Sequence, residues 1–176
     1  MKIHIMGASC AGSTTLGTAL SEQLTIPYFD TDLFFWERSD IPYTVKRDPV
    51  IRNKMLSESL SALDHYIVGG SLIGWGEEWQ NMFDLVVFLY VPQQVRLQRL
   101  VNRERERYGE VIYTDPHRNR LFKAFYSWAS GYDDPLFTGR NVKIHEEWIS
   151  KLSCRVIEIR GDTTIDERLK FIYDHI

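Results

Sequence analysis

A run of small and hydroxyl-bearing residues near the start of the chain has the spacing needed to hold a phosphate group. Residues 7–15 read Gly-Ala-Ser-Cys-Ala-Gly-Ser-Thr-Thr, between an apolar segment and an amphipathic one. Glycines let backbone N–H groups turn inward around an anion, and the N-terminus of a following helix adds partial positive charge. The residues fit the pattern of a phosphate-binding loop at every position but one, because Ser13 stands where the pattern has a lysine.

Each residue of this loop is a candidate phosphate ligand. The missing lysine would reach the β- and γ-phosphates as a point charge, so the loop is built for an anion but lacks its usual cation. Thr14 would supply the hydroxyl that holds a magnesium ion. The alternative is a plain glycine-rich turn from strand to helix. The predicted nucleotide-phosphate ligands are Gly7, Ala8, Ser9, Cys10, Ala11, Gly12, Ser13, Thr14 and Thr15.

Two carboxylates follow the second apolar segment, at residues 30 and 32. In a parallel α/β sheet, ligands bind where strands end and helices begin, so Asp30 and Asp32 are candidates for a metal site or for accepting a proton from a substrate hydroxyl. The strongest strand, residues 84–91, ends without an acidic residue, so a metal-binding carboxylate is expected from this pair. The alternative is that either aspartate only caps the helix that begins near residue 33.

Four arginines are spaced to lie along one side of a helix. Arg96, Arg99, Arg103 and Arg107 step by three, four and four residues, which places them within a narrow arc. They form either a salt-bridged surface helix or a clamp that stabilises charge on transferring phosphates. Because Ser13 leaves the loop without a cation, we predict that Arg103 and Arg107 act as catalytic residues.

Basic and glycine-containing segments elsewhere are candidates for binding an acceptor. Lys46, Arg47 and Arg52 either contact an anionic group of the acceptor or form a solvated face. Gly70 and Ser71 follow another predicted strand, and glycine at such a turn allows a ligand to approach the backbone closely.

These residues are positioned by a regular alternation of apolar strands and amphipathic helices. This alternation predicts an α/β fold with three layers, αβα, around a five-stranded parallel sheet, in a single domain over residues 1–176. The predicted strands are residues 2–7, 25–30, 65–71, 84–91 and 155–159.

The composition is that of an ordinary globular protein, with 44% hydrophobic and 26% charged residues. A net charge of −3 argues against nucleic-acid binding, and Cys10 and Cys154 are too few for a disulfide scaffold or a cysteine zinc site. No signal peptide and no apolar run of spanning length is found, so we expect a cytoplasmic protein without membrane partners. His145 lacks the spacing of a zinc motif and is expected on a helix surface.

With its loop and its Asp30-Thr31-Asp32 segment, the chain resembles the small-molecule kinases of the P-loop fold, namely adenylate kinase-like, shikimate kinase-like and gluconate kinase-like enzymes. It looks most similar to bacterial proteins described as adenylate kinase-like or as AAA-family ATPases. The Asp-x-Asp segment is similar to that of shikimate kinases. This resemblance implies that Asp30 supports magnesium, that Asp32 contacts the acceptor hydroxyl and that residues 69–71 line the acceptor pocket. It also implies that the arginine-rich helix leads into a lid, approximately residues 103–125.

The resemblance implies an ATP- and Mg²⁺-dependent kinase that transfers the γ-phosphoryl group to a small-molecule or nucleoside monophosphate acceptor. ATP or another nucleotide and the acceptor would be its partners. The predicted acceptor ligands are Asp32, Arg47, Gly70 and Ser71, and the predicted metal ligands are Thr14 and Asp30. The alternative is a nucleotide-binding regulator or degenerate kinase with little turnover, because Ser13 replaces the lysine of the loop.

Overall fold

The computed structural model describes residues 1–176 and contains one five-stranded sheet in which all strands are parallel. The strand order is β2-β3-β1-β4-β5, so the first strand lies at the centre. This confirms the predicted α/β architecture. The strands are β1 (Lys2–Gly7), β2 (Tyr28–Asp30), β3 (Tyr66–Gly69), β4 (Leu85–Tyr90) and β5 (Arg155–Arg160).

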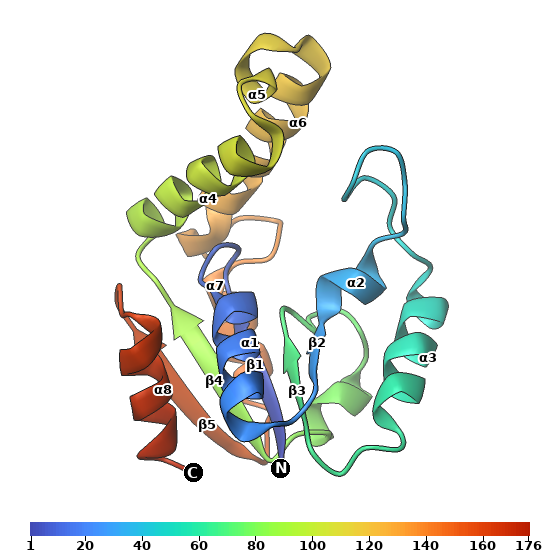
Figure 1. Cartoon of the computed structure of the whole chain (residues 1–176), viewed down its shortest axis with the longest axis vertical. Helices are drawn as coiled ribbons and strands as arrows, with labels where there is room; N and C mark the ends of the chain where they lie inside the picture. Colours follow the sequence, from blue (N-terminus) through green and yellow to red (C-terminus); the bar gives the residue numbers. More distant parts are fainter.

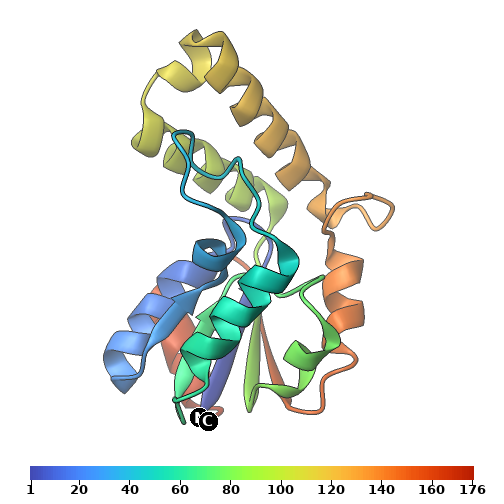
Figure 2. The same ribbon diagram turned by 90° about the vertical axis from the view of Figure 1, so that its right-hand side faces the viewer.

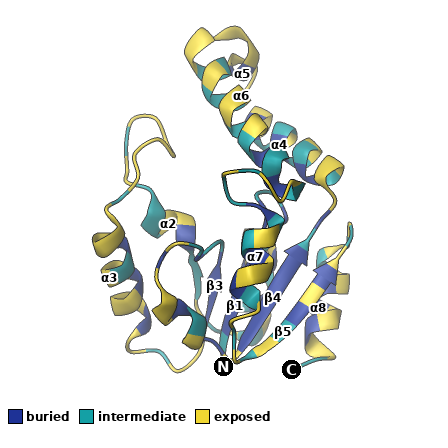
Figure 3. Ribbon diagram, turned by 180° about the vertical axis from the view of Figure 1, so that it is seen from behind, coloured by how far each residue is buried: buried dark blue, intermediate teal, exposed yellow.

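The central strands are largely apolar because helices cover both faces of the sheet. In β1, Ile3 pairs with Ile67 of β3 on one side and with Leu85 of β4 on the other, and all three side chains are buried. A strand covered on both faces cannot alternate apolar and polar residues, which accounts for the near-continuous apolar character of β1 and β4. Figure 3 shows these strands as the most deeply buried part of the chain.

Two apolar clusters form the core, one on each face of the sheet. Helices α1 (Ser13–Leu24) and α8 (Ile165–Tyr173) cover the first face and contribute Leu16, Leu20, Leu169 and Ile172. The second face is covered by α3 (Pro49–Leu60), the short helix η1 (Glu77–Asn81) and α7 (Val142–Ile149) (Figures 1 and 3). The result is the three-layer arrangement that the sequence predicts.

Two segments project from the edge of the sheet where the strands end. Helices α4 (Gln93–Tyr108), α5 (Val111–Thr114) and α6 (Pro116–Ser130) form an arm, and residues 36–47 form a loop after α2 (Thr31–Phe35) (Figures 1 and 2). The arm includes the predicted lid, residues 103–125, and extends beyond it at both ends. Its tip contacts the loop, because the Arg107 guanidinium lies 5.0 Å from the centre of the Tyr43 ring.

The arm is fixed to the sheet by the buried side chain of Arg96. Its guanidinium donates hydrogen bonds to the backbone oxygens of Val91 (2.9 Å) and Ala129 (3.4 Å) and pairs with Asp133 of η2 (Gly131–Asp133). The carboxylate of Asp133 also accepts a hydrogen bond from Tyr90 at the end of β4. Both ends of the arm are therefore tied to one ion pair at its base.

The expected surface position of His145 was wrong. This side chain of α7 is completely buried, and its Nδ1 atom lies 2.8 Å from the Tyr132 hydroxyl. Burial lowers its pKa well below the ordinary value, so the ring is neutral.

None of the helices combines the length and the apolar character needed to span a membrane.

Candidate phosphate and acceptor site

The loop between β1 and α1 has the backbone conformation that an anion cradle requires. Cys10 and Gly12 both have positive φ angles, 63° and 97°, so the chain turns sharply at two places before the helix begins. No side chain caps the N-terminus of α1, so its first N–H groups face outward without a side-chain acceptor. Such a turn followed by an uncapped helix N-terminus favours a bound phosphate.

The structure brings Asp30 to the first turn of α1. The Thr14 hydroxyl donates a hydrogen bond of 2.8 Å to Asp30 Oδ2, although the two residues lie on different elements. Asp30 also caps α2, because its Oδ1 accepts a bond of 2.9 Å from the Asp32 backbone N–H. From the sequence, helix capping and metal binding were alternative roles for Asp30. In this structure one carboxylate oxygen serves as the cap while the other faces Thr14.

The Thr14 and Asp30 oxygens suit a magnesium ion. Magnesium keeps most of its waters and commonly takes only one or two protein oxygens together with the phosphates of a nucleotide. The chain has no group of three or more histidine, cysteine, aspartate or glutamate side chains that could hold a metal ion by themselves. These two residues would hold the ion beside the phosphate loop.

Asp32 lies beside Asp30, at the first turn of α2. Desolvation by the surrounding protein and then the charge of Asp30 raise the pKa of the Asp32 carboxyl, while Arg140 and Arg103 oppose the shift. The side chain remains accessible to solvent. A carboxylate with a raised pKa that a ligand can reach is suited to accept a proton.

The two arginines that act on Asp32 are supported by two aromatic side chains of α6. The Arg103 guanidinium lies 5.5 Å from the Phe125 ring centre, and that of Arg140 lies 5.1 Å from the Trp128 ring centre. The Nε atoms of both arginines are buried without a hydrogen-bond partner. Arg103 also acts on the loop, because its charge opposes the burial that raises the pKa of Cys10. Arg103 is thus shared between the loop and Asp32.

Sequence reasoning did not find Arg140. It lies in the segment between η2 and α7, where the residues show no periodicity and match no motif. The only available signal was its type, an arginine in a loop, and many surface arginines share that feature. Its position depends on the fold, which places this loop next to α2.

The other two arginines of the α4 series point to different surroundings. Arg107 lies beside Tyr43, on the side of the arm that faces the 36–47 loop. Its Nη1 atom is 4.0 Å from the Glu104 carboxylate. Arg99 pairs with Asp162, at 2.6 Å, in the turn between β5 and α8. The spacing of the series along one side is preserved, but its four members contact four separate parts of the molecule.

The predicted acceptor ligands on the other side of the site have structural contacts of their own. Arg47 donates hydrogen bonds to the backbone oxygens of Leu33 (3.2 Å) and Phe34 (2.8 Å) at the end of α2. Arg52 is buried, with its guanidinium over the Trp75 ring and a bond of 2.9 Å to the Gly74 backbone oxygen. In this structure both guanidinium groups hold the chain around α2 and α3.

The turn at Gly70 packs directly against α2. Gly70 has a φ of 111°, and a Cβ atom there would lie 1.9 Å from the Thr31 hydroxyl oxygen. Only glycine allows this approach. Ser71 follows, with its Oγ accepting a bond of 3.4 Å from the Ile73 N–H. The turn therefore lies against Thr31, the residue between the two aspartates.

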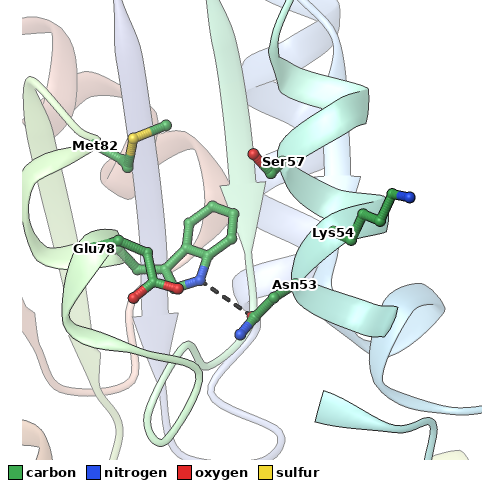
Figure 4. A pocket seen from close by; sticks show the side chains of 6 residues that line it. Asn53, Lys54, Ser57, Glu78 and Met82 are labelled. Atoms are coloured by element: carbon green, nitrogen blue, oxygen red, sulfur yellow. Dashed lines mark hydrogen bonds between the residues drawn. The ribbon is translucent and has the colours of Figure 1, made fainter. Parts of the chain in front are cut away.

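A separate hollow of about 310 Å³ lies between α3 and η1 (Figure 4). The Trp79 indole donates a hydrogen bond of 3.2 Å to Asn53 at its wall. None of its lining residues belongs to the predicted site. They are Asn53, Lys54, Ser57, Glu78, Trp79 and Met82.

Comparison with known proteins identifies the family. No family model matches the chain. The chain is 39% identical over 174 residues to the uncharacterized protein YqaC of Bacillus subtilis, an alignment that covers 99% of this chain and 96% of YqaC. The chain belongs to the YqaC family.

More distant similarities connect the YqaC family to kinases. The chain is 26% identical to the cytidylate kinase of Sulfolobus acidocaldarius over 147 residues, which cover 76% of this chain and 78% of that kinase. The crystal structure of shikimate kinase from Bacteroides thetaiotaomicron shares its fold, with a TM-score of 0.56 at 18% identity over 99% of this chain and 98% of that one. The YqaC family member described here is thus part of the P-loop small-molecule kinase superfamily, as the sequence predicts.

Proposed function

We propose that this protein is an ATP- and Mg²⁺-dependent phosphotransferase that acts on a small-molecule or nucleoside monophosphate acceptor. The observation that carries the proposal is the hydrogen bond between Thr14 and Asp30, because it joins the loop to the two aspartates at one edge of the sheet. A phosphate donor, a metal and an acceptor hydroxyl would meet at this point. The named relatives of the chain, a cytidylate kinase and shikimate kinases, transfer phosphoryl groups as their names state.

In the proposed reaction, Asp32 binds the acceptor hydroxyl and takes its proton as the oxygen bonds to the γ-phosphorus. The bond from the γ-phosphorus to the β,γ-bridging oxygen breaks, and ADP leaves. Backbone N–H groups of residues 7–15 hold the phosphates, and magnesium, when bound at Thr14 and Asp30, neutralises part of their charge. Positioning and charge stabilisation supply most of the rate enhancement in such reactions.

Arg103 is the predicted catalytic arginine with the better location, because its charge acts on both Cys10 and Asp32. It would contact the phosphoryl group between donor and acceptor. Arg107 would reach that group only when the arm moves and the contact with Tyr43 is released. Arg140, close to Asp32, is proposed to bind an anionic group of the acceptor beside its hydroxyl. Arg47, Gly70 and Ser71 would complete the acceptor side.

A second candidate is a nucleotide-binding regulator with little turnover, which the substitution at Ser13 favours. The two functions are separated by measuring binding and turnover on the same preparation. Nucleotide binding is measured by thermal shift with Mg–ATP, Mg–GTP and ADP, and turnover by ADP release with a panel of phosphorylated and hydroxylated metabolites. A ligand at about one hundred times its dissociation constant stabilises a fold by about 2.7 kcal/mol.

For the kinase, we expect stabilisation by Mg–ATP and ADP release that one class of acceptor stimulates. The Asp32→Asn variant should keep nucleotide binding and lose the stimulated ADP release, since it removes only the proton acceptor. Binding without turnover on any acceptor would favour the regulator. Absence of any nucleotide-induced shift would refute both functions. A proper control is Asp134→Asn, an exposed aspartate in the loop after η2 and outside the proposed site.

A further inference from the structure

One arginine of α8 is buried beneath the phosphate loop without a counter-charge. Arg168 is 1% exposed and forms no ion pair. Its Nη1 donates a hydrogen bond of 2.9 Å to the Ala11 backbone oxygen, and its Nε donates one of 2.9 Å to the Thr163 hydroxyl. The remaining nitrogen, Nη2, is buried without a partner. A buried cation that neutral oxygens satisfy only in part is costly, which indicates that an anion belongs close to it.

The position of this cation relates directly to the missing lysine. A Cβ atom on Gly12, the residue before Ser13, would stand 3.0 Å from Arg168 Nη1 and 3.9 Å from Arg99 Nη1. Two guanidinium groups therefore flank the point where the loop enters α1. Arg168 belongs to α8 and Arg99 to α4, and Arg99 also pairs with Asp162 in the turn between β5 and α8.

The protein supplies only one ion-pair partner, Asp162, for these two charges. Burial first and then the charge of Arg99 lower the pKa of Arg168, and Asp162 only partly opposes them. Asp162 pairs with Arg99 at 2.6 Å, and its side chain is 54% exposed. Asp162 thus pairs with only one of the two arginines, and a net positive charge remains beside the loop. This arrangement suits a ligand that brings additional negative charge.

We infer that Arg168, together with Arg99, supplies from outside the loop the positive charge that a lysine at position 13 would otherwise give, and that nucleoside di- and triphosphates bind there through it. This inference rests on the proposed function, because it assumes that the loop holds a nucleotide. In this view Ser13 does not disable the loop. A lysine at position 13 would place a third cation beside two guanidinium groups, so its replacement by serine avoids repulsion.

The test removes the positive charge at position 168, adds one at position 13, or does both. The affinities for ADP and for adenosine are measured by calorimetry. Arg168→Gln should weaken ADP binding about ten-fold or more, the usual loss when a charged hydrogen-bond donor is removed, and leave adenosine affinity unchanged. Arg168→Lys should recover most of the loss because the charge is kept. The double variant Ser13→Lys with Arg168→Gln should bind ADP within about three-fold of the parent. Arg160→Gln, on β5 and half-exposed, is the matched control.

Ser13→Lys in the otherwise unchanged chain gives the decisive comparison, and it does not depend on whether Arg168→Gln folds. No gain, or a loss, of ADP affinity supports the inference. A ten-fold gain would mean that the loop had lacked a cation and would overturn it. Equal loss of ADP and adenosine binding in Arg168→Gln would indicate a structural role only and would also overturn it. If the parent protein binds neither ADP nor Mg–ATP, the proposed function fails, and the inference fails with it.

Discussion

Replacement of Asp30 separates the helix cap from the metal site, because the two carboxylate oxygens have different partners. Asp30→Ala removes the bond from the Asp32 N–H, a cap worth about 1 kcal/mol, and the bond from the Thr14 hydroxyl, worth about another 1 kcal/mol. In a domain of this size, a loss of about 2 kcal/mol lowers the melting temperature by about 4–8 °C. Asp30→Asn keeps an oxygen for the cap, so it should cost less than about 1 kcal/mol.

The functional readout is the dependence of nucleotide affinity on magnesium, measured by titration of ATP with and without Mg²⁺. The parent protein should bind ATP more tightly with the ion, and Asp30→Asn should lose most of that difference. Asp48→Ala is the control, because Asp48 caps α3 through Val50 and Ile51 but lies outside the site. It should lower stability by about 1 kcal/mol and leave the magnesium dependence unchanged. A normal magnesium dependence in Asp30→Asn would refute the assignment of Asp30 to the metal.

Two further predictions concern buried ionisable side chains of the core and of the arm. Arg96→Met breaks the buried ion pair at the base of the arm, so thermal melting should show a loss of about 3 kcal/mol in the free energy of unfolding. Arg105→Gln, which removes an exposed ion pair on the same helix, is the control and should cost less than about 1 kcal/mol. Equal losses in the two variants would contradict this account of the arm. Burial lowers the pKa of His4 from 6.5 to about 4. As the pH falls, the imidazole of His4 is therefore protonated in the unfolded chain before it is protonated in the folded one. The free energy of unfolding should fall by about 3 kcal/mol between pH 6.5 and pH 4 for this reason. Denaturant titrations of His4→Phe should show a shallower loss over this range, with His145 keeping part of the slope, and an unchanged slope would refute the role of His4.

The sequence was sufficient for the fold because its signals are local and repeated. Near-continuous apolar strands, each followed by an amphipathic helix, permit few arrangements besides a parallel sheet covered on both faces. The same reasoning placed Asp30, Asp32 and Gly70 at the edge where the strands end, and the structure brings all three around α2. These residues follow strands directly, so strand order alone determines which of them become neighbours.

The cations of the site were harder to predict, because a guanidinium reaches several ångströms from its own element. The spacing of Arg103 and Arg107 predicts a common face of α4, yet Arg103 lies over Phe125 of α6 and Arg107 lies over Tyr43. A usable signal did exist for Arg168. It lies between Ile165, Leu169 and Ile172 on the apolar stripe of α8, and a charged residue in that register must be buried.

This distribution of charge has a consequence for how the proposed nucleotide site would work. A lysine within the loop would bind phosphate wherever the arm lies, whereas Arg99 belongs to the arm and Arg168 to α8. A phosphate chain that contacts both would join the arm to the body of the domain, so its binding free energy would also stabilise one arm position. ADP should therefore slow backbone amide exchange in α4 as well as in the loop. The Arg99→Gln variant should lose the protection in α4 and keep it in residues 7–15, and protection retained in both would show that the arm does not respond to the phosphates through Arg99.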